Sequence, residues 1–236
     1  MQLEVLGDAD SVARQAAATI AADARAALAA RGRYALAVSG GHTPWIMLRA
    51  LANEDLAWTN VHLYQVDERI APDGDLDRNL THLRESFLSH VSFPPENVHA
   101  MPVESPDPDA AARQYAATLQ EFAGSPPILD LVHLGLGPDG HTASLVPADP
   151  VLNVTNADVA LTGIYQGRRR MTLTYPVLNR ARRVLWVVTG SEKVEMLRRL
   201  VDGDQSIPAG RVRREQALLL ADRAAAGSLK SAQAFI

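Results

Sequence analysis

Residues 129–145 read Leu-Asp-Leu-Val-His-Leu-Gly-Leu-Gly-Pro-Asp-Gly-His-Thr-Ala-Ser-Leu, and this stretch decides the fold class of the chain. Residues 128–136 are nearly continuously apolar, which is typical of a strand buried on both faces of a parallel sheet. Glycines follow, and a glycine lets the backbone approach a ligand closely. Asp139 and His141 come next. Because histidine is the commonest general base, the stretch predicts a buried strand that presents a proton-transfer pair at its carboxyl end.

The glycine spacing of residues 135–140 also matches the Gly-x-Gly-x-x-Gly fingerprint of dinucleotide-binding proteins, with Asp158 about where an acidic residue is needed. The surrounding sequence disagrees with this interpretation. Pro138 occupies the turn, and Pro147 and Pro150 interrupt the helix that should carry the pyrophosphate. We therefore expect no dinucleotide cofactor.

Strand and helix patterns alternate along the whole chain, which is typical of an α/β fold with a mainly parallel sheet. No internal repeat or linker divides the sequence, so residues 1–236 are expected to form a single domain, an open sheet with helices on both faces. The expected strands are 34–38, 61–66, 98–103, 128–136, 159–164, 171–173, 184–188 and 217–221, and the expected helices are 11–31, 44–51, 80–91, 107–122, 192–201 and a short alanine-rich segment after the last strand.

The composition limits the possible partners. Apolar residues make up 47% of the chain and charged residues 21%, an ordinary balance for a soluble globular protein. The net charge of -4 disfavours binding to nucleic acid. The absence of cysteine excludes disulfides, thiolate metal sites and a cysteine nucleophile. No secretory signal and no apolar run of ~20 residues is visible. We expect a cytoplasmic monomer that binds neither nucleic acid nor membranes.

Polar clusters follow four of the predicted strands. In an open parallel sheet, ligands bind outside the carboxyl ends of the strands, so these clusters are expected to meet at one edge. They are residues 39–43, 67–69, 135–141 and 189–193.

The first cluster, Ser39-Gly40-Gly41-His42-Thr43-Pro44, joins a strand to a helix. Its glycines free backbone N–H groups to face a ligand, Thr43 can cap the helix, and Pro44 suits the first helical position. A helix N-terminus with free amides is a ready anion site. The segment is not a Walker loop, because the Gly-Lys-Ser/Thr ending is missing. A turn without any ligand is the alternative.

The remaining charged residues have a structural and a functional interpretation. Asp67-Glu68-Arg69 is either a solvated rim or a place where Arg69 meets an oxyanion or phosphate and Asp67 orients it or binds a sugar hydroxyl. Of the triplet 168–170, Arg170 is expected to face inward. Lys193 is one of only two lysines and stands in a first helical turn, where a cation is unfavourable unless an anion compensates it. The other lysine is Lys230.

Metal and serine chemistry find little support in the sequence. Asp139, His141 and His133 are few ligands for a metal, and His133 lies inside the apolar strand, where a core role is expected. Neither Ser39 nor Ser144 stands in a Gly-x-Ser-x-Gly elbow. We expect neither a metal nor another cofactor.

Taken together, the motifs Ser39-Gly40-Gly41-x-Thr43-Pro44, Asp67-Glu68-Arg69 and the run 135–145 make the chain similar to the 6-phosphogluconolactonases of the glucosamine-6-phosphate isomerase/6-phosphogluconolactonase family. The resemblance extends from about residue 12 to residue 226. It implies hydrolysis of 6-phospho-D-glucono-1,5-lactone in the pentose phosphate pathway without a cofactor, so the expected partner is a small sugar-phosphate lactone.

The resemblance also implies roles for individual residues. His141 is the base that activates water, Asp139 supports its imidazole, and Arg69 lies beside the reacting ester, with Asp67 in the same catalytic group. The implied substrate and phosphate ligands are Ser39, Gly40, Gly41, His42, Thr43, Asn79, Gly137, Arg170 and Lys193.

Two competing functions remain. The isomerase/deaminases of the same family typically carry Asp-Glu-Tyr in place of Asp67-Glu68-Arg69, and a glutamate where this chain has Val146. A non-catalytic sugar-phosphate sensor normally carries a DNA-reading module, for which this acidic chain has no room.

Overall fold

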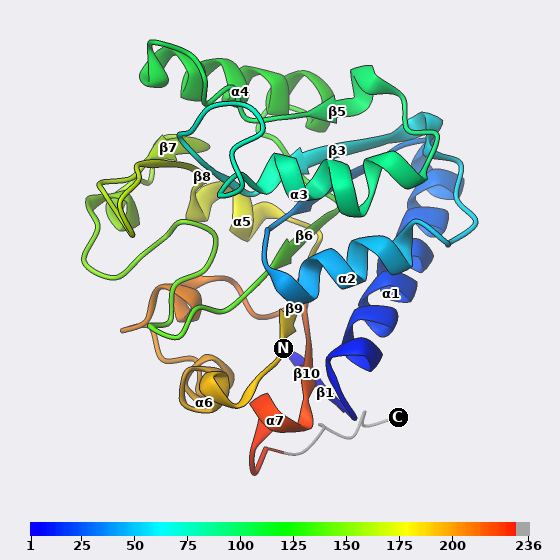
Figure 1. The fold of residues 1–236 in the computed structure, drawn as a ribbon, viewed down its shortest axis with the longest axis vertical. Helices are drawn as coiled ribbons and strands as arrows, with labels where there is room; N and C mark the ends of the chain where they lie inside the picture. Colours follow the sequence, from blue (N-terminus) through cyan, green and yellow to red (C-terminus); the bar gives the residue numbers. More distant parts are fainter. Residues whose placement is uncertain (230–236) are drawn as a thin grey trace.

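A computed structural model describes residues 1–229 of the chain, so Lys230 lies outside the described residues. Within that range lie a seven-stranded sheet, in which every neighbouring pair of strands is parallel, and a separate three-stranded antiparallel sheet (Figure 1). The large sheet contains, in spatial order, β1 (Gln2–Leu6), β10 (Ala217–Asp222), β9 (Arg183–Val188), β6 (Leu131–Leu134), β2 (Tyr34–Val38), β3 (Val61–Gln65) and β5 (Val98–His99).

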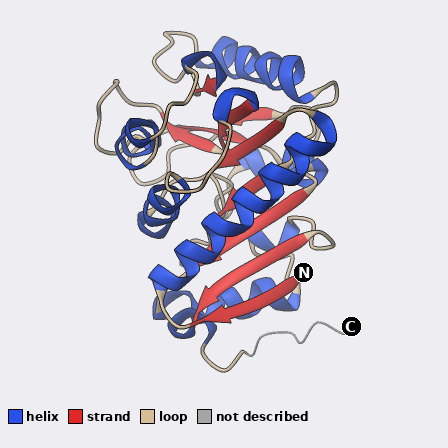
Figure 2. Cartoon of the chain, turned by 90° about the vertical axis from the view of Figure 1, so that its right-hand side faces the viewer, coloured by secondary structure: helices blue, strands red, loops and turns tan. Residues whose placement is uncertain are grey.

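Helices cover both faces of the large sheet, as the alternating pattern predicts (Figure 2). The long helix α1 crosses one face, where Asp8 caps its first turn by accepting from the Ser11 backbone N–H at 2.7 Å and Gly32 ends it in the left-handed region. The helices are α1 (Ala9–Arg31), α2 (His42–Leu51), α3 (Asn79–Ser86), α4 (Pro108–Ala123), α5 (Tyr175–Arg180), α6 (Val194–Asp202) and α7 (Arg223–Ala226).

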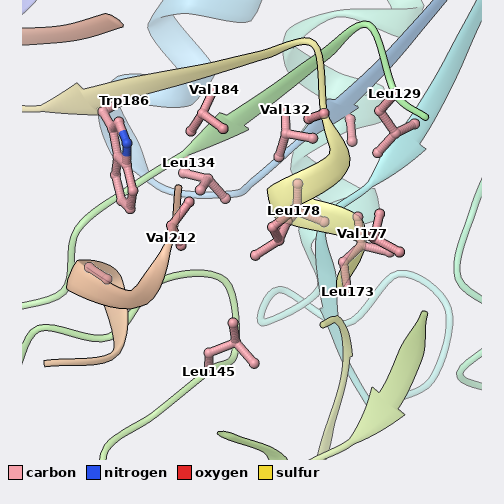
Figure 3. Packing of buried hydrophobic residues seen from close by; sticks show 14 of the residues in the cluster. Leu129, Val132, Leu134, Leu145, Leu173, Val177, Leu178, Val184, Trp186 and Val212 are labelled. Carbon is pink, nitrogen blue, oxygen red and sulfur yellow. The ribbon is translucent and has the colours of Figure 1, made fainter. Parts of the chain in front are cut away.

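Two hydrophobic cores lie on opposite sides of the large sheet. One contains side chains of α1, α2 and α3, and the other contains side chains of α4 to α7. Strand β6 contributes to both, which explains why all its residues except His133 are apolar. Figure 3 shows Val132 and Leu134 of β6 beside Val184 and Trp186 of β9, on the side where Leu178 of α5 lies. This packing fixes the carboxyl end of β6, from which the loop with Asp139 and His141 leaves.

The small sheet differs from the prediction. Residues 159–164 and 171–173 were expected as strands of a mainly parallel sheet, and residues 67–69 as a polar cluster after a strand. Instead these regions pair with one another in an antiparallel sheet, because residues 67–69 lie opposite residues 170–172. Its strands, in spatial order, are β4 (Asp67–Arg69), β8 (Arg170–Leu173) and β7 (Val159–Leu161).

Several element boundaries also differ. Strand β1 was not predicted, and the strand expected at 98–103 spans only Val98–His99. The helix expected at 80–91 ends at Ser86, and a separate 3-10 turn covers Leu88–His90. Another 3-10 turn, Ser191–Lys193, precedes α6, so Lys193 lies at the N-cap of that helix instead of inside its first turn.

No helix within residues 1–229 is both long enough and apolar enough to cross a membrane.

Candidate active site

A pocket of about 220 Å³ opens at the carboxyl edge of the large sheet, between this edge and the small sheet. All four predicted polar clusters contribute to it, as sheet topology requires. It is lined by Ser39, Gly40, Gly41, Asp67, Arg69, Asn79, Gly135, Leu136, Gly137, Pro138, His141, Ala143, Arg170 and Lys193.

Two predicted phosphate ligands do not line this pocket. His42 and Thr43 line a neighbouring pocket of about 420 Å³, which shares Gly40, Gly41, Gly135, Leu136 and Lys193 with the first. Helix α2 begins at His42, two residues earlier than expected, so both residues lie in its first turn. The Thr43 hydroxyl does not cap the helix but lies 2.6 Å from the hydroxyl of Thr189.

His141 and Asp139 form a hydrogen-bonded pair. The Nδ1 atom of His141 lies 2.5 Å from Oδ1 of Asp139, and the His141 backbone N–H donates to the same oxygen at 3.1 Å. A carboxylate can only accept, so Nδ1 carries the proton and Nε2 keeps a free lone pair. Asp139 does not line the pocket; it lies behind the imidazole, where it can hold the ring in this tautomer.

The carboxylate of Asp139 is held in its charged form. Burial alone would raise its pKa, but the backbone N–H of His141, the His141 ring and the Tyr165 hydroxyl offset this effect, and the net pKa is lowered. Tyr165 donates to Oδ2 of Asp139 at 3.0 Å. Tyr165 was not predicted from the sequence, in which Gly167, two residues later, is the local signal for a turn.

Arg69 and Asn79 form a second pair across the pocket. A guanidinium nitrogen of Arg69 donates to Oδ1 of Asn79, whose Nδ2 donates to the backbone oxygen of Asp67 at 2.9 Å. The Ser144 hydroxyl donates to Oδ2 of Asp67 at 2.6 Å. This bond connects the loop that carries Asp139 and His141 to strand β4. The sequence predicted residues 67–69 at the edge where the polar clusters meet, and these hydrogen bonds explain how Asp67 and Arg69 are held there.

Glu68 lies under this pair and was not expected to be buried. Its carboxylate accepts from the backbone N–H groups of Arg69, Asn79 and Leu80 at 2.8–2.9 Å. It also pairs with Arg78 at 3.3 Å, and both side chains are at most 1% exposed. The middle residue of the charged triplet is therefore a structural anchor.

Arg170 faces the pocket, as expected, and only 5% of it is exposed. Burial lowers its pKa, and the neighbouring cation Arg69 lowers it further. Within residues 1–229, neither Arg69 nor Arg170 has a carboxylate oxygen within 4 Å, and Nε of Arg170 has no hydrogen-bond partner. Arg168, by contrast, bonds Asp75 and Asp77 at 2.9 Å.

Lys193 adds a third cation to the pocket. Its nearest acidic partner is Glu192, with 3.9 Å between the ammonium nitrogen and the carboxylate oxygen. Two buried or half-buried guanidinium groups and an ammonium that face one cavity repel one another unless an anion lies between them. The charges thus favour an anionic ligand such as a phosphate.

His133 does not reach the pocket. It is fully buried in β6, where its Nδ1 atom accepts from the Ser39 backbone N–H at 3.3 Å. The three ligands considered for a metal are therefore not assembled, and residues 1–229 contain no cluster of three or more histidine or acidic side chains able to hold one.

The fold and the site define an α/β protein whose carboxyl-edge pocket joins a carboxylate-supported histidine to three cations, an arrangement suited to acid–base chemistry on an anionic substrate. The family model of glucosamine-6-phosphate isomerases/6-phosphogluconolactonase matches residues 7–220, and the chain belongs to this family.

Individual relatives agree with this assignment. The chain is 37% identical to a 6-phosphogluconolactonase of Mycobacterium tuberculosis, over 97% of this chain and 98% of that protein. It is 40% identical to a 6-phosphogluconolactonase of Synechocystis, over 67% of this chain and 68% of that protein. The solved 6-phosphogluconolactonase of Thermotoga maritima is 26% identical and superimposes with a TM-score of 0.84, covering 94% of this chain and 98% of that one.

Proposed function

We propose that this protein hydrolyses 6-phospho-D-glucono-1,5-lactone to 6-phospho-D-gluconate in the pentose phosphate pathway. The observation that carries the proposal is the His141–Asp139 pair facing the same cavity as Arg69, Arg170 and Lys193. An ester needs a base, a group that stabilises the oxyanion, and a fixed handle for orientation. The names of the relatives support the same reaction.

His141 acts as the general base in the proposed mechanism. Its free Nε2 takes a proton from a water molecule, and the water oxygen attacks the lactone carbonyl carbon. The carbonyl oxygen becomes an oxyanion, which Arg69 stabilises. The intermediate then collapses, the bond from the carbonyl carbon to the ring oxygen breaks, and His141 returns its proton to that oxygen. Asp139 stays ionised throughout and stabilises the imidazolium.

The phosphate holds the lactone in place. Arg170 and Lys193 neutralise its charge, and the backbone N–H groups of residues 40–43 donate to its oxygens. Fixing the substrate by a group remote from the reacting carbon converts binding energy into orientation. We assign Asp67, Asn79 and Gly137 to the same site, where they shape the pocket.

We also propose that the enzyme works in the cytoplasm as a monomer and needs no metal or organic cofactor. The mechanism supports the last point, since every step uses a side chain of this chain. Sedimentation of the purified protein tests the oligomeric state. Treatment with EDTA tests the metal, and a rate that falls and recovers with an added cation would contradict the proposal.

The reaction is tested by following acid release from 6-phosphogluconolactone, with the spontaneous hydrolysis subtracted, and by offering glucosamine 6-phosphate in parallel. We expect acceleration of lactone hydrolysis alone. Release of ammonia and fructose 6-phosphate from the second substrate would contradict the proposal. Val146 is 4% exposed at the position where the deaminases typically carry a glutamate, so the carboxylate of that reaction is absent here.

The first prediction concerns the base. His141→Asn removes Nε2 as a proton acceptor, so we expect kcat to fall by 10² to 10⁴-fold, the usual contribution of a general base. Binding of 6-phosphogluconate, measured by calorimetry, should stay within a few-fold of wild type, because the cations remain. A variant with wild-type turnover would remove His141 from the mechanism.

A further inference from the structure

A two-residue turn carries an aromatic side chain to the edge of the pocket. Tyr165 and Arg168 pair through two backbone hydrogen bonds, of 2.9 and 3.2 Å, and the residues between them, Gln166 and Gly167, have φ angles of 51° and 80°. Two central residues with positive φ are the mark of a type I′ turn, whose twist suits antiparallel strands. The turn connects β7 and β8, so Tyr165 projects from the tip of a hairpin.

Tyr165 contacts the proposed base and its supporting carboxylate. Its hydroxyl donates to Oδ2 of Asp139 at 3.0 Å, while Oδ1 of that carboxylate is occupied by His141. Its ring stands edge-on to the His141 ring, with 5.5 Å between ring centres and an interplanar angle of 67°. Asp139 is thus held through both oxygens, and the imidazole has an aromatic neighbour.

The same ring also supports a cation of the pocket. The guanidinium carbon of Arg170 lies 4.9 Å from the ring centre of Tyr165, within the range of a cation–π interaction. The neighbouring Gln166 accepts a hydrogen bond from Arg170 at 3.1 Å. One hairpin tip therefore contacts both the base pair and a phosphate-binding side chain.

Hydrogen bonds from Arg168 anchor the hairpin to a neighbouring loop. Arg168 donates to Asp75 and Asp77 at 2.9 Å each, which links the hairpin to the loop that precedes α3. A tip that is anchored in this way can hold a side chain in one position instead of sampling several.

We propose that Tyr165 is a positioning residue that fixes Asp139 through its hydroxyl and Arg170 through its ring, so that one side chain aligns the base with the phosphate anchor. The inference rests on the proposed lactonase function and deepens it. Burial and the hydrogen bond to Asp139 raise the pKa of Tyr165, so the hydroxyl stays protonated and remains a donor at neutral pH.

Two substitutions separate the hydroxyl from the ring. Tyr165→Phe keeps the ring and removes the hydrogen bond to Asp139. We expect kcat to fall about five-fold, as for the loss of one hydrogen bond, with little change in KM. The Asp139 carboxylate then accepts one hydrogen bond fewer and stabilises the His141 imidazolium more strongly. The acid limb of the pH profile of kcat should therefore move to higher pH. Tyr165→Leu also removes the ring beneath Arg170, and we expect KM to rise about ten-fold in addition.

The control is Tyr34→Phe, which removes a buried hydroxyl without a hydrogen-bond partner at the amino end of β2. Its kinetics and acid limb should match wild type. NMR titration of the His141 imidazole in the protein without substrate gives a readout independent of turnover, and its pKa should be higher in Tyr165→Phe than in wild type.

The outcomes separate the two proposals. If wild type fails to hydrolyse the lactone, the proposed function fails, while the His141 titration still tests the coupling to Tyr165. If wild type is active and Tyr165→Phe changes neither kcat, the acid limb nor the His141 titration, the positioning role is wrong. Thermal melts show whether either variant has lost its fold, and Tyr165→Phe keeps the ring that packs at the hairpin tip.

Discussion

The orientation of His141 depends on an atom that position 137 lacks. A Cβ built on Gly137 would lie 2.0 Å from Nδ1 of His141 and 2.2 Å from its Cε1. Real Cβ atoms do not approach so closely, so the ring would have to move away from Asp139. This contact explains one of the glycines that imitate a dinucleotide motif: it makes room for the imidazole.

We predict that Gly137→Ala loses most activity and retains its fold. The displaced His141 ring loses its hydrogen bond to Asp139 and its orientation toward the substrate. A misplacement of about 1 Å lowers kcat on the order of 10²-fold. Gly7→Ala is the control, since a Cβ there meets nothing within 4 Å. Steady-state kinetics and thermal melts decide: a fully active Gly137→Ala variant would show that the ring is free to relocate.

The cations of the pocket are expected to act on binding. Arg170→Ala and Lys193→Ala each remove a charge from the phosphate site, so KM should rise ten-fold or more while kcat changes less. Arg169→Ala is a matched control, because Arg169 bonds the Thr162 carbonyl and does not line the pocket. A pure kcat effect in either pocket variant would contradict the phosphate role.

At the scale of elements, helix α3 and strand β4 share one anchor. The Glu68 side chain accepts from backbone N–H groups in the first turn of α3 and from that of Arg69, so a single carboxylate positions both Arg69 and Asn79. A carboxylate at a helix N-terminus also interacts favourably with the helix dipole. The orientation of two pocket residues therefore depends on one buried charge.

Glu68→Gln tests this anchor. The amide removes the charge that pairs with buried Arg78 and presents an N–H group where donors already converge, so we expect a loss of about 3 kcal/mol in the free energy of unfolding. The value of kcat/KM should fall as well. Glu104→Gln is the control: Glu104 also pairs with Arg78 but is 53% exposed, and its loss should be under about 1 kcal/mol. Urea titrations measure both, and equal losses would contradict the anchor.

At the scale of the whole molecule, the large sheet was predictable and the small one was not. Strands such as β6 carry apolar residues on both faces, and this local pattern predicts a parallel sheet between two helical layers. Strand β4 reads Asp-Glu-Arg, which carries no strand signal. It forms because residues about one hundred positions later lie opposite it, and such a non-local pairing is not written in either segment alone.

The site follows the same division. Asp139, His141 and the segment 39–43 were predictable because strand ends of one sheet meet at one edge. Arg170 was predicted from its place beside an expected strand, and it begins β8 of the small sheet. Glu68 and Tyr165 were missed, since their importance comes from burial and from the hairpin of the small sheet. His42 and Thr43 line the neighbouring pocket, and α2 begins two residues earlier than the sequence indicated. Local chemistry therefore identifies the reacting groups, whereas their supports depend on tertiary pairing.

One buried histidine joins the centre of the sheet to the pocket. The His133 ring accepts from the Ser39 backbone N–H, and the Ser39 hydroxyl donates to the His133 backbone oxygen at 3.1 Å. Burial lowers the pKa of His133 to about 3, and burial also lowers that of His99 to about 4. Protonation of the ring would remove the acceptor that holds Ser39, the first residue of the segment 39–43.

These histidines make the stability of the protein depend on pH. In the unfolded chain a histidine binds a proton near pH 6.5, well above its folded value, so the stabilisation is complete above about pH 6.5 and is lost as the pH falls. Between pH 6 and pH 4, His133 alone should remove about 2 kcal/mol from the free energy of unfolding.

The variant His133→Asn tests this, because it keeps an acceptor for Ser39 but does not titrate. In this variant the slope of the unfolding free energy against pH should correspond to nearly one proton fewer taken up on unfolding. His90→Asn, at an exposed position, should not. Urea titrations across this pH range decide, and equal slopes in wild type and His133→Asn would show that His133 does not control the acid stability of the fold.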